Sequence, residues 1–127
     1  MAEGVYGIDV TYKAAASLSA YQYHFVYLSA ANTVNVAGAN ARTCGILQNK
    51  PDAAGESATV RILGLSKLVA GEEIALGKMI TAKSDGHGEI ADAASEWVGA
   101  IAHEAATAAN DIISVEIAGF DAHESDA

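Results

Sequence analysis

Four histidines and one cysteine are the side chains of this sequence best suited to binding a metal or attacking a substrate. The histidines are His24, His87, His103 and His123. No two of them have the i, i+4 spacing at which histidines on a helix bind zinc in many enzymes. Cys44 is the only cysteine, so neither an internal disulfide nor a multi-cysteine zinc site can form. We therefore expect solvent-exposed histidines and a buried, unreactive thiol, and we predict no catalytic, cofactor-binding or metal-binding residue.

Other motifs that support catalysis are incomplete in this sequence. No serine stands in a Gly-x-Ser-x-Gly context. His87-Gly88-Glu89 resembles the His-x-Glu of zinc deaminases, whose chemistry also needs a Cys-x-x-Cys that a single cysteine cannot supply. Lys78-Met79 is the kind of dipeptide that carries biotin at a hairpin tip, but the tip predicted here is several residues later, at Asp85-Gly86. The sequence therefore predicts a protein that is not an enzyme.

The composition limits the classes of partner. The chain has 127 residues, about one domain, and a formal net charge of −9, with its seven basic residues scattered. Binding to nucleic acid requires clustered basic groups, and a membrane span requires about 20 consecutive apolar residues, so neither partner is expected. Half of the residues are hydrophobic, but many of these are alanine, whose burial stabilises little. We therefore expect additional stability from association between subunits.

Short stretches with β-branched and aromatic residues, separated by turn residues, predict an all-β fold. It would be a small β-barrel or β-sandwich of about 8–10 short strands with an extended N-terminal arm. The hairpin at 79–91 is the clearest, because Asp85-Gly86 suits the positive φ angles of a tight turn. A second hairpin turn is expected at 71–73, and the segment 104–109 is expected to be a loop. The predicted strands are 21–28, 33–37, 43–47, 57–63, 67–70, 74–76, 79–82, 89–91, 97–102 and 112–118.

The ends of the chain differ from its centre. We divide it into an N-terminal arm (1–20), a β-domain (21–120) and an acidic C-terminal tail (121–127). The arm alternates apolar with small or polar residues, which is typical of a strand without an obvious partner. Either it pairs with another molecule, or it is an ordinary first strand of the domain. In the first case its interface residues would be Val5, Tyr6, Ile8, Val10 and Tyr12.

An internal similarity connects the two halves of the domain. Cys44-Gly45-Ile46-Leu47 resembles Val98-Gly99-Ala100-Ile101, and Val60-Arg61-Ile62-Leu63-Gly64 resembles Val115-Glu116-Ile117-Ala118-Gly119. The first pair is offset by 54 positions and the second by 55, which implies loops that differ by one residue. Two similar strand–loop–strand units in one small chain indicate a pseudo-symmetric barrel or sandwich.

From about residue 21 to residue 117 the sequence resembles the capsid cement, or head decoration, family of tailed phages and prophages. The ordered series that carries the resemblance is Cys44-Gly45-Ile46-Leu47-Gln48-Asn49 with Pro51, Ala53-Ala54-Gly55-Glu56-Ser57-Ala58-Thr59-Val60-Arg61, Gly64, Lys67-Leu68-Val69-Ala70-Gly71, Ile74-Ala75-Leu76-Gly77-Lys78-Met79-Ile80-Thr81, Asp85-Gly86, Val98-Gly99-Ala100-Ile101-Ala102 and Ile113-Ser114-Val115. The resemblance implies a small β fold without catalysis or cofactor, and homo-trimers at local three-fold positions of a capsid.

On that basis we expect a cement protein that binds the major capsid protein on the outer surface of the virion. It would be made in the host cytoplasm, would bind neither nucleic acid nor membrane, and would stabilise the assembled head. Two alternatives stay open: another virion β-module, such as a head fibre base or a tail component, and a small carrier or enzyme domain. The sequence does not decide whether the loop around 50–52 or the loop around Glu104 faces the shell.

Overall fold

The computed structural model describes residues 7–92 and 96–121, and the regular secondary structure of this part of the chain is almost entirely β-strand. The predicted all-β class is confirmed. A single 3-10 turn, η1 (Ser84–Gly86), interrupts the strands, and no helix in the described ranges is long and apolar enough to cross a membrane. The strands are β1 (Gly7–Ala14), β2 (Phe25–Ala30), β3 (Thr33–Val36), β4 (Gly45–Leu47), β5 (Ser57–Val69), β6 (Met79–Ala82), β7 (Gly88–Ile90), β8 (Trp97–Ala102) and β9 (Ile112–Asp121).

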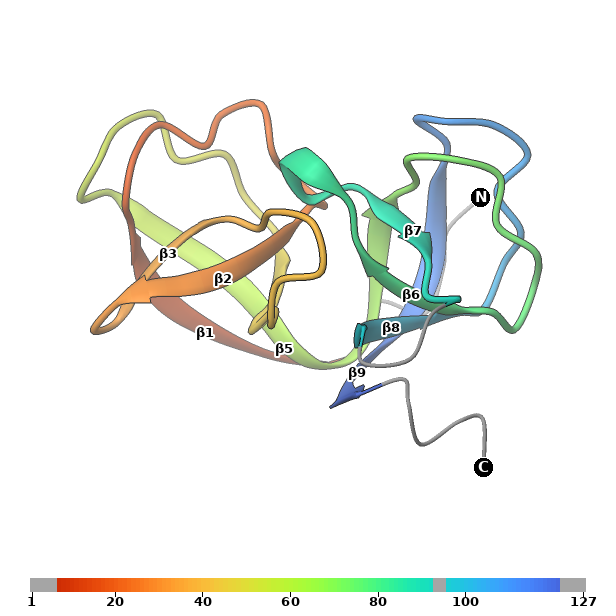
Figure 1. Cartoon of the computed structure of the whole chain (residues 1–127). Helices are drawn as coiled ribbons and strands as arrows, with labels where there is room; N and C mark the ends of the chain where they lie inside the picture. Colours follow the sequence, from red (N-terminus) through yellow and green to blue (C-terminus); the bar gives the residue numbers. More distant parts are fainter. Residues whose placement is uncertain (1–6, 93–95, 122–127) are drawn as a thin grey trace.

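The strands form two rings that share β5. The hydrogen-bonded order is β1-β3-β2-β4-β5-β9-β8-β6-β7, and a further pairing between β1 and β5 closes the first five strands into a ring. A parallel bridge between Ala70, just after β5, and Gly88 of β7 closes the second ring, at the place of the parallel pairing between β1 and β3 in the first ring. Figure 1 shows the rings as two lobes, with β5 passing from one to the other. We call residues 7–63 the first unit and residues 64–121 the second unit.

The two units are structural repeats. The first half of β5 closes the first unit and its second half opens the second, so the strand orders correspond one to one. Ile46 of β4 pairs with Arg61, and Ile101 of β8 pairs with Glu116 of β9, each residue 55 positions further along. The similarity seen in the sequence is therefore structural, but the predicted offset of 54 for its first strand was wrong. The loops 48–56 and 103–111 are equal in length.

The two loops also repeat their hydrogen bonds. In the first unit, the Asp52 amide donates to the Glu56 carboxylate at 2.8 Å; in the second, the Thr107 amide donates to the Asp111 carboxylate at 2.8 Å. Gly55 and its equivalent Asn110 both have a positive φ, 88° and 75°. The segment 104–109 is a loop, as predicted. A carboxylate at the equivalent position accepts hydrogen bonds from backbone amides in each of the two loops.

The strand β5 is continuous where the sequence indicated two strands. The predicted strands 57–63 and 67–70 are one strand bent at Gly64, whose φ is 101°. The backbone of glycine adopts this conformation readily because no Cβ obstructs it, so the strand can turn from β1 to β9 without ending. The hairpin expected at 71–73 is wrong as well. Ile74 instead bridges to Ala106 of the opposite loop.

The largest side chain that the first unit contributes to the core of the second is that of Phe25. Phe25 is fully buried in a cluster dominated by second-unit residues such as Leu68, Ile80 and Val115. A Cβ on Gly99 would lie 2.8 Å from the Phe25 ring, so glycine at this position makes room for the aromatic side chain. A separate cluster, which includes Val26, Val34, Leu47 and Val60, lies within the first unit. The two rings are thus packed into one body and are not independent domains.

Of the other strand predictions, some are confirmed and some differ from the structure in where the strand begins or ends. The strand 97–102 and the hairpin 79–91 are confirmed, with Asp85 and Gly86 at positive φ in the turn. The predicted strand 21–28 is shifted, because Tyr23 has a φ of 64° and turns the chain before β2 starts at Phe25. The strand predicted at 112–118 extends to Asp121, and the rest of the predicted tail lies outside the described residues.

The segment predicted as an arm contains a strand of the first unit. β1 pairs along its length with β5, from Gly7 opposite Gly64 to Lys13 opposite Ser57, and its end pairs in parallel with β3. Residues 7–14 therefore fit the second of the two interpretations, an ordinary first strand. Residues 1–6 lie outside the described ranges.

We predict that Gly64→Ala lowers the free energy of unfolding by about 1–3 kcal/mol, because alanine at this positive φ is strained. Urea unfolding followed by tryptophan fluorescence measures the change, since Trp97 is the single tryptophan. Gly38→Ala is the matched control, because no atom lies within 4 Å of a Cβ at Gly38 and its φ is not positive. Equal stability of the two variants would contradict the importance of the bend.

Candidate binding surfaces

The described residues contain no group of three or more histidine, cysteine, aspartate or glutamate side chains that could hold a metal ion. Two open hollows occur on the second unit. One is polar and includes Lys83, Asp85 and His87; the other, near Ile74 and Ile90, is mostly apolar. In the polar hollow, the Lys83 ammonium donates to the Gly71 carbonyl at 3.0 Å. Neither hollow brings a nucleophile, a base and an oxyanion donor together.

Among the three described histidines, His24 is buried and His87 is half-buried, whereas solvent-exposed histidines were expected. His24 is 7% exposed, and its ring packs edge-on against the His87 ring, with 4.7 Å between the centroids. This contact joins the start of β2 in the first unit to the turn after η1 in the second. His103 is exposed as predicted and lies 3.1 Å from the Glu116 carboxylate. His123 lies outside the described residues.

Burial lowers the pKa of His24 below its ordinary value. The neighbouring His87 acts in the same direction, while hydrogen bonds of the imidazole to the backbone of Gln22 and Tyr21 and the charge of Asp85 act in the opposite one. The His24 Nδ1 atom lies 2.9 Å from the Gln22 carbonyl, and the Tyr21 ring packs on the other side. The neutral imidazole is thus part of the contact between the units.

The Cys44 thiol is half-buried just before β4. Burial raises the pKa of Cys44 to about 11. A thiol with so high a pKa carries almost no thiolate at neutral pH, and thiolate is the nucleophile in cysteine chemistry. The predicted unreactive thiol agrees with this environment, although the side chain is less deeply buried than expected.

Six large apolar side chains are exposed in the described part of the chain. They are Ile8, Leu28, Leu63, Leu76, Ile112 and Phe120. Two of them are cross-strand neighbours: Ile8 on β1 pairs with Leu63 on β5, and they are 53% and 56% exposed. We call these two residues the Ile8–Leu63 pair. The pair lies at the boundary of the first unit, because Leu63 directly precedes the bend of β5 at Gly64.

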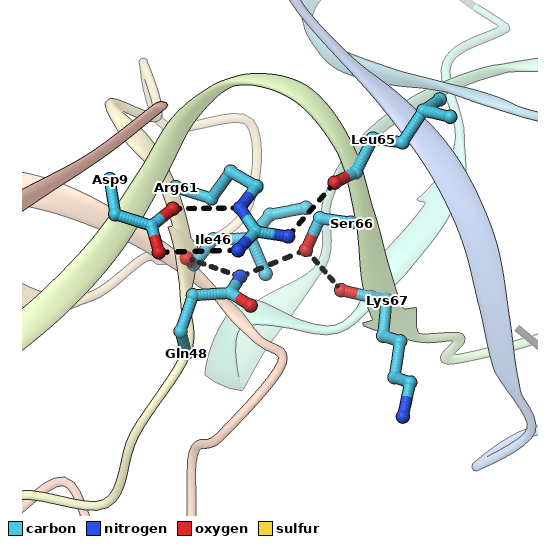
Figure 2. A network of polar contacts seen from close by, with 7 residues as sticks. All are labelled: Asp9, Ile46, Gln48, Arg61, Leu65, Ser66 and Lys67. Carbon is cyan, nitrogen blue, oxygen red and sulfur yellow. Dashed lines mark hydrogen bonds and ion pairs between the residues drawn. The ribbon is translucent and has the colours of Figure 1, made fainter. Parts of the chain in front are cut away.

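A polar network holds the backbone beside this pair. The Arg61 guanidinium donates from Nε to Asp9 Oδ1 at 2.7 Å and from Nη2 to Asp9 Oδ2 at 3.2 Å. Its Nη1 donates at 3.1 Å to the Leu65 carbonyl, across the bend at Gly64. Figure 2 shows this arrangement together with Gln48, whose amide nitrogen donates to the Ser66 hydroxyl at 2.9 Å. The Arg61 side chain is only 13% exposed, whereas that of Asp9 is 34% exposed, so the guanidinium is the shielded part of the network. The network ties β1, β4 and both halves of β5 together.

The predicted interface residues of the arm differ in how exposed they are. Ile8 is exposed, whereas Val10 and Tyr12 are half-buried, and Tyr12 packs against the core cluster of the first unit. Val5 and Tyr6 lie outside the described ranges. The exposed partner of Ile8, Leu63, was not singled out in the sequence. Alternation along the strand places Leu63 on the same face as Ser57, Thr59 and Arg61, so the pattern itself indicated its exposure.

Charge is distributed unevenly between the repeats. Residues 7–63 contain four basic and three acidic residues, a formal charge of +1. Residues 64–121 contain three basic and ten acidic residues, a formal charge of −7. Two units with the same backbone therefore differ strongly in surface electrostatics. Finding this difference in the sequence requires the repeat boundary, which lies within one continuous strand.

The low pKa of His24 predicts a loss of stability in acid. Below the ordinary histidine pKa of about 6.5, the unfolded chain takes up a proton that the folded chain resists, so stability present above that pH falls as the pH is lowered. We expect the urea midpoint of the wild type to fall more between pH 7.5 and pH 5 than that of His24→Phe. His103→Gln, at an exposed site, is the control and should follow the wild type. Parallel pH dependence in wild type and His24→Phe would contradict this assignment.

The high pKa of Cys44 predicts slow chemical labelling. At pH 8 the native thiol should react with a disulfide reagent roughly a hundredfold or more slowly than the thiol of the urea-unfolded chain, whose pKa is about 8.5. Absorbance of the released thiolate measures both rates. Cys44→Ala gives the background. Equal native and unfolded rates would show that the thiol is accessible and ionised.

Comparison with known proteins gives a structural match only. Neither a protein-family model nor a curated protein matches the sequence. Among solved structures, the fold is similar to that of the N base of the head fibre gp8.5 of bacteriophage phi29, with a TM-score of 0.67 at 19% sequence identity. The match covers 87% of this chain and 93% of the other. The chain therefore shares its fold, over nearly its whole length, with a module from a phage head fibre.

Proposed function

We propose that this protein is a structural component of a tailed-phage particle, and that it acts as a head-attached base module like that of a head fibre. The observation that carries the proposal is the shared fold, which covers 87% of this chain and 93% of the other.

The chemistry of the described surfaces supports a binding role. The hollows are open and lack convergent reactive groups, the thiol is hardly ionised at neutral pH, and the buried histidine takes part in packing between the units. Exposed apolar side chains on rigid strands are the kind of feature that protein interfaces use. Such a module attaches by complementarity of surfaces and does not require a reaction.

The second candidate is a cement protein that stabilises the head. It is favoured by the ordered sequence resemblance to the decoration family. A subunit that binds the assembled shell more tightly than free capsid protein stabilises that shell by mass action, and many copies add their contributions. In this form the protein would bind the major capsid protein on the outside of the head as a homo-trimer. Both candidates share attachment to the head and differ in what the attached module does.

For the contact itself we propose the start of the chain, with Val5, Tyr6 and Ile8 as contact residues. Ile8 is exposed and is the second residue of β1, next to the first residue that the structure describes. Tyr12 contributes indirectly, because it packs against the core of the first unit and anchors β1 there. Val10 is half-buried on the same strand.

The test uses heads from the phage or prophage whose genome carries this sequence, produced with its gene deleted. We expect purified protein to co-sediment with these heads and to saturate at a fixed number of copies, because the binding positions are set by the lattice. A cryo-electron microscopy map of the saturated heads separates the candidates. Density for a fibre that continues from the module supports a base, and increased heat resistance of the heads without a fibre supports cement. Heads that take up no protein would refute both.

A further inference from the structure

The two repeats present chemically different surfaces on one backbone plan. The second unit has a formal charge of −7, and Glu73, Asp92 and Glu116 are among its exposed carboxylates. The first unit has a formal charge of +1 and is nearly neutral. Placing charged groups in an interface removes them from water, which is unfavourable unless each is paired. The first unit has seven charged side chains and the second has thirteen, so a partner can cover the first unit at a lower desolvation penalty.

Each unit has three of the exposed large apolar side chains in the described part of the chain, but only in the nearly neutral first unit are two of them cross-strand neighbours. The Ile8–Leu63 pair has both side chains more than half exposed, and its strands are fixed by the two hydrogen bonds between Arg61 and Asp9. A preorganised apolar pair beside a satisfied polar network resembles the centre and rim of a protein interface. In the second unit, the exposed Leu76 lies in the segment 71–78, between two glutamates and a lysine, Glu72, Glu73 and Lys78.

We propose that the first unit is the docking unit, that the Ile8–Leu63 pair inserts into an apolar depression of the head shell, and that the acidic second unit faces the solvent. The partner is the outer protein surface of an assembled phage head, so this orientation rests on the proposed function. Charge is the argument for this occupant. Many copies on one shell place like-charged units near each other, and acidic units directed into water repel neighbours less than acidic units pressed against a surface.

The effect of salt on binding distinguishes this orientation from the opposite one. Apolar docking of a nearly neutral unit should persist when NaCl is raised from 0.1 M to 0.5 M, because screening removes little attraction. Docking of the acidic unit on a basic patch of the shell would weaken steeply over the same range. Retained binding at high salt is the result we expect, and a large loss would overturn the orientation.

A matched pair of substitutions tests the residues. Leu63→Glu and Leu76→Glu each place a carboxylate on a leucine that is 56% or 68% exposed, one in each unit. We expect Leu63→Glu to weaken binding to gene-deleted heads at least tenfold and Leu76→Glu to change it less than twofold. Unfolding midpoints near that of the wild type show that both variants are folded. Ile8→Thr, a milder change in the same pair, should weaken binding severalfold and serves if Leu63→Glu does not fold.

The outcomes separate this inference from the function on which it rests. If the wild type does not bind heads, the proposed function fails. If the wild type binds, but Leu76→Glu is the variant that loses binding, or all variants bind equally, the function stands and the orientation is wrong. A cryo-electron microscopy map of wild-type protein on heads gives a second readout, in which the first unit should contact the shell.

Discussion

The bend of β5 at Gly64 is the constraint on which the rest of the structure depends. One strand must pair with β1 and β4 in its first half and with β9 in its second, and only a continuous backbone that turns at positive φ satisfies both. Arg61 stabilises the turn from one side, since its guanidinium binds Asp9 before the bend and the Leu65 carbonyl after it (Figure 2). Without this turn the second ring would have no opening strand.

The two repeats share one topology, and contacts between unlike side chains fit them together. Equivalent loops keep the same hydrogen bonds, because each must satisfy backbone amides at the same place. Side chains at the junction have not been kept alike. Phe25 enters the second core at Gly99, and Trp97 of the second unit donates at 3.2 Å to Thr43 of the first while Arg42 lies 4.9 Å above its ring. Such contacts make the repeats parts of one folding unit.

Local patterns in the sequence predicted local structure well. The hairpin around Asp85-Gly86 and the strand 97–102 follow from turn chemistry and alternation within a few residues. The continuity of β5 could not be predicted in this way, because a glycine within an alternating strand can end it, kink it or bend it. The partner of β1 and the burial of His24 depend on contacts far apart in sequence. Of the Ile8–Leu63 pair, Ile8 was predicted from the sequence as an interface residue and Leu63 was not.

Two repeats with the same backbone can have surfaces with different functions. Were both units apolar and neutral, each could bind the shell, and copies would also associate with each other through their free units. Were both units acidic, neither could be covered without removing many carboxylates from water. A single charge difference between copies of one backbone avoids both problems, because it leaves one surface fit for contact and keeps the other hydrated. The fold supplies two equivalent positions, and the distribution of ten carboxylates between β5 and the end of β9 makes them unequal.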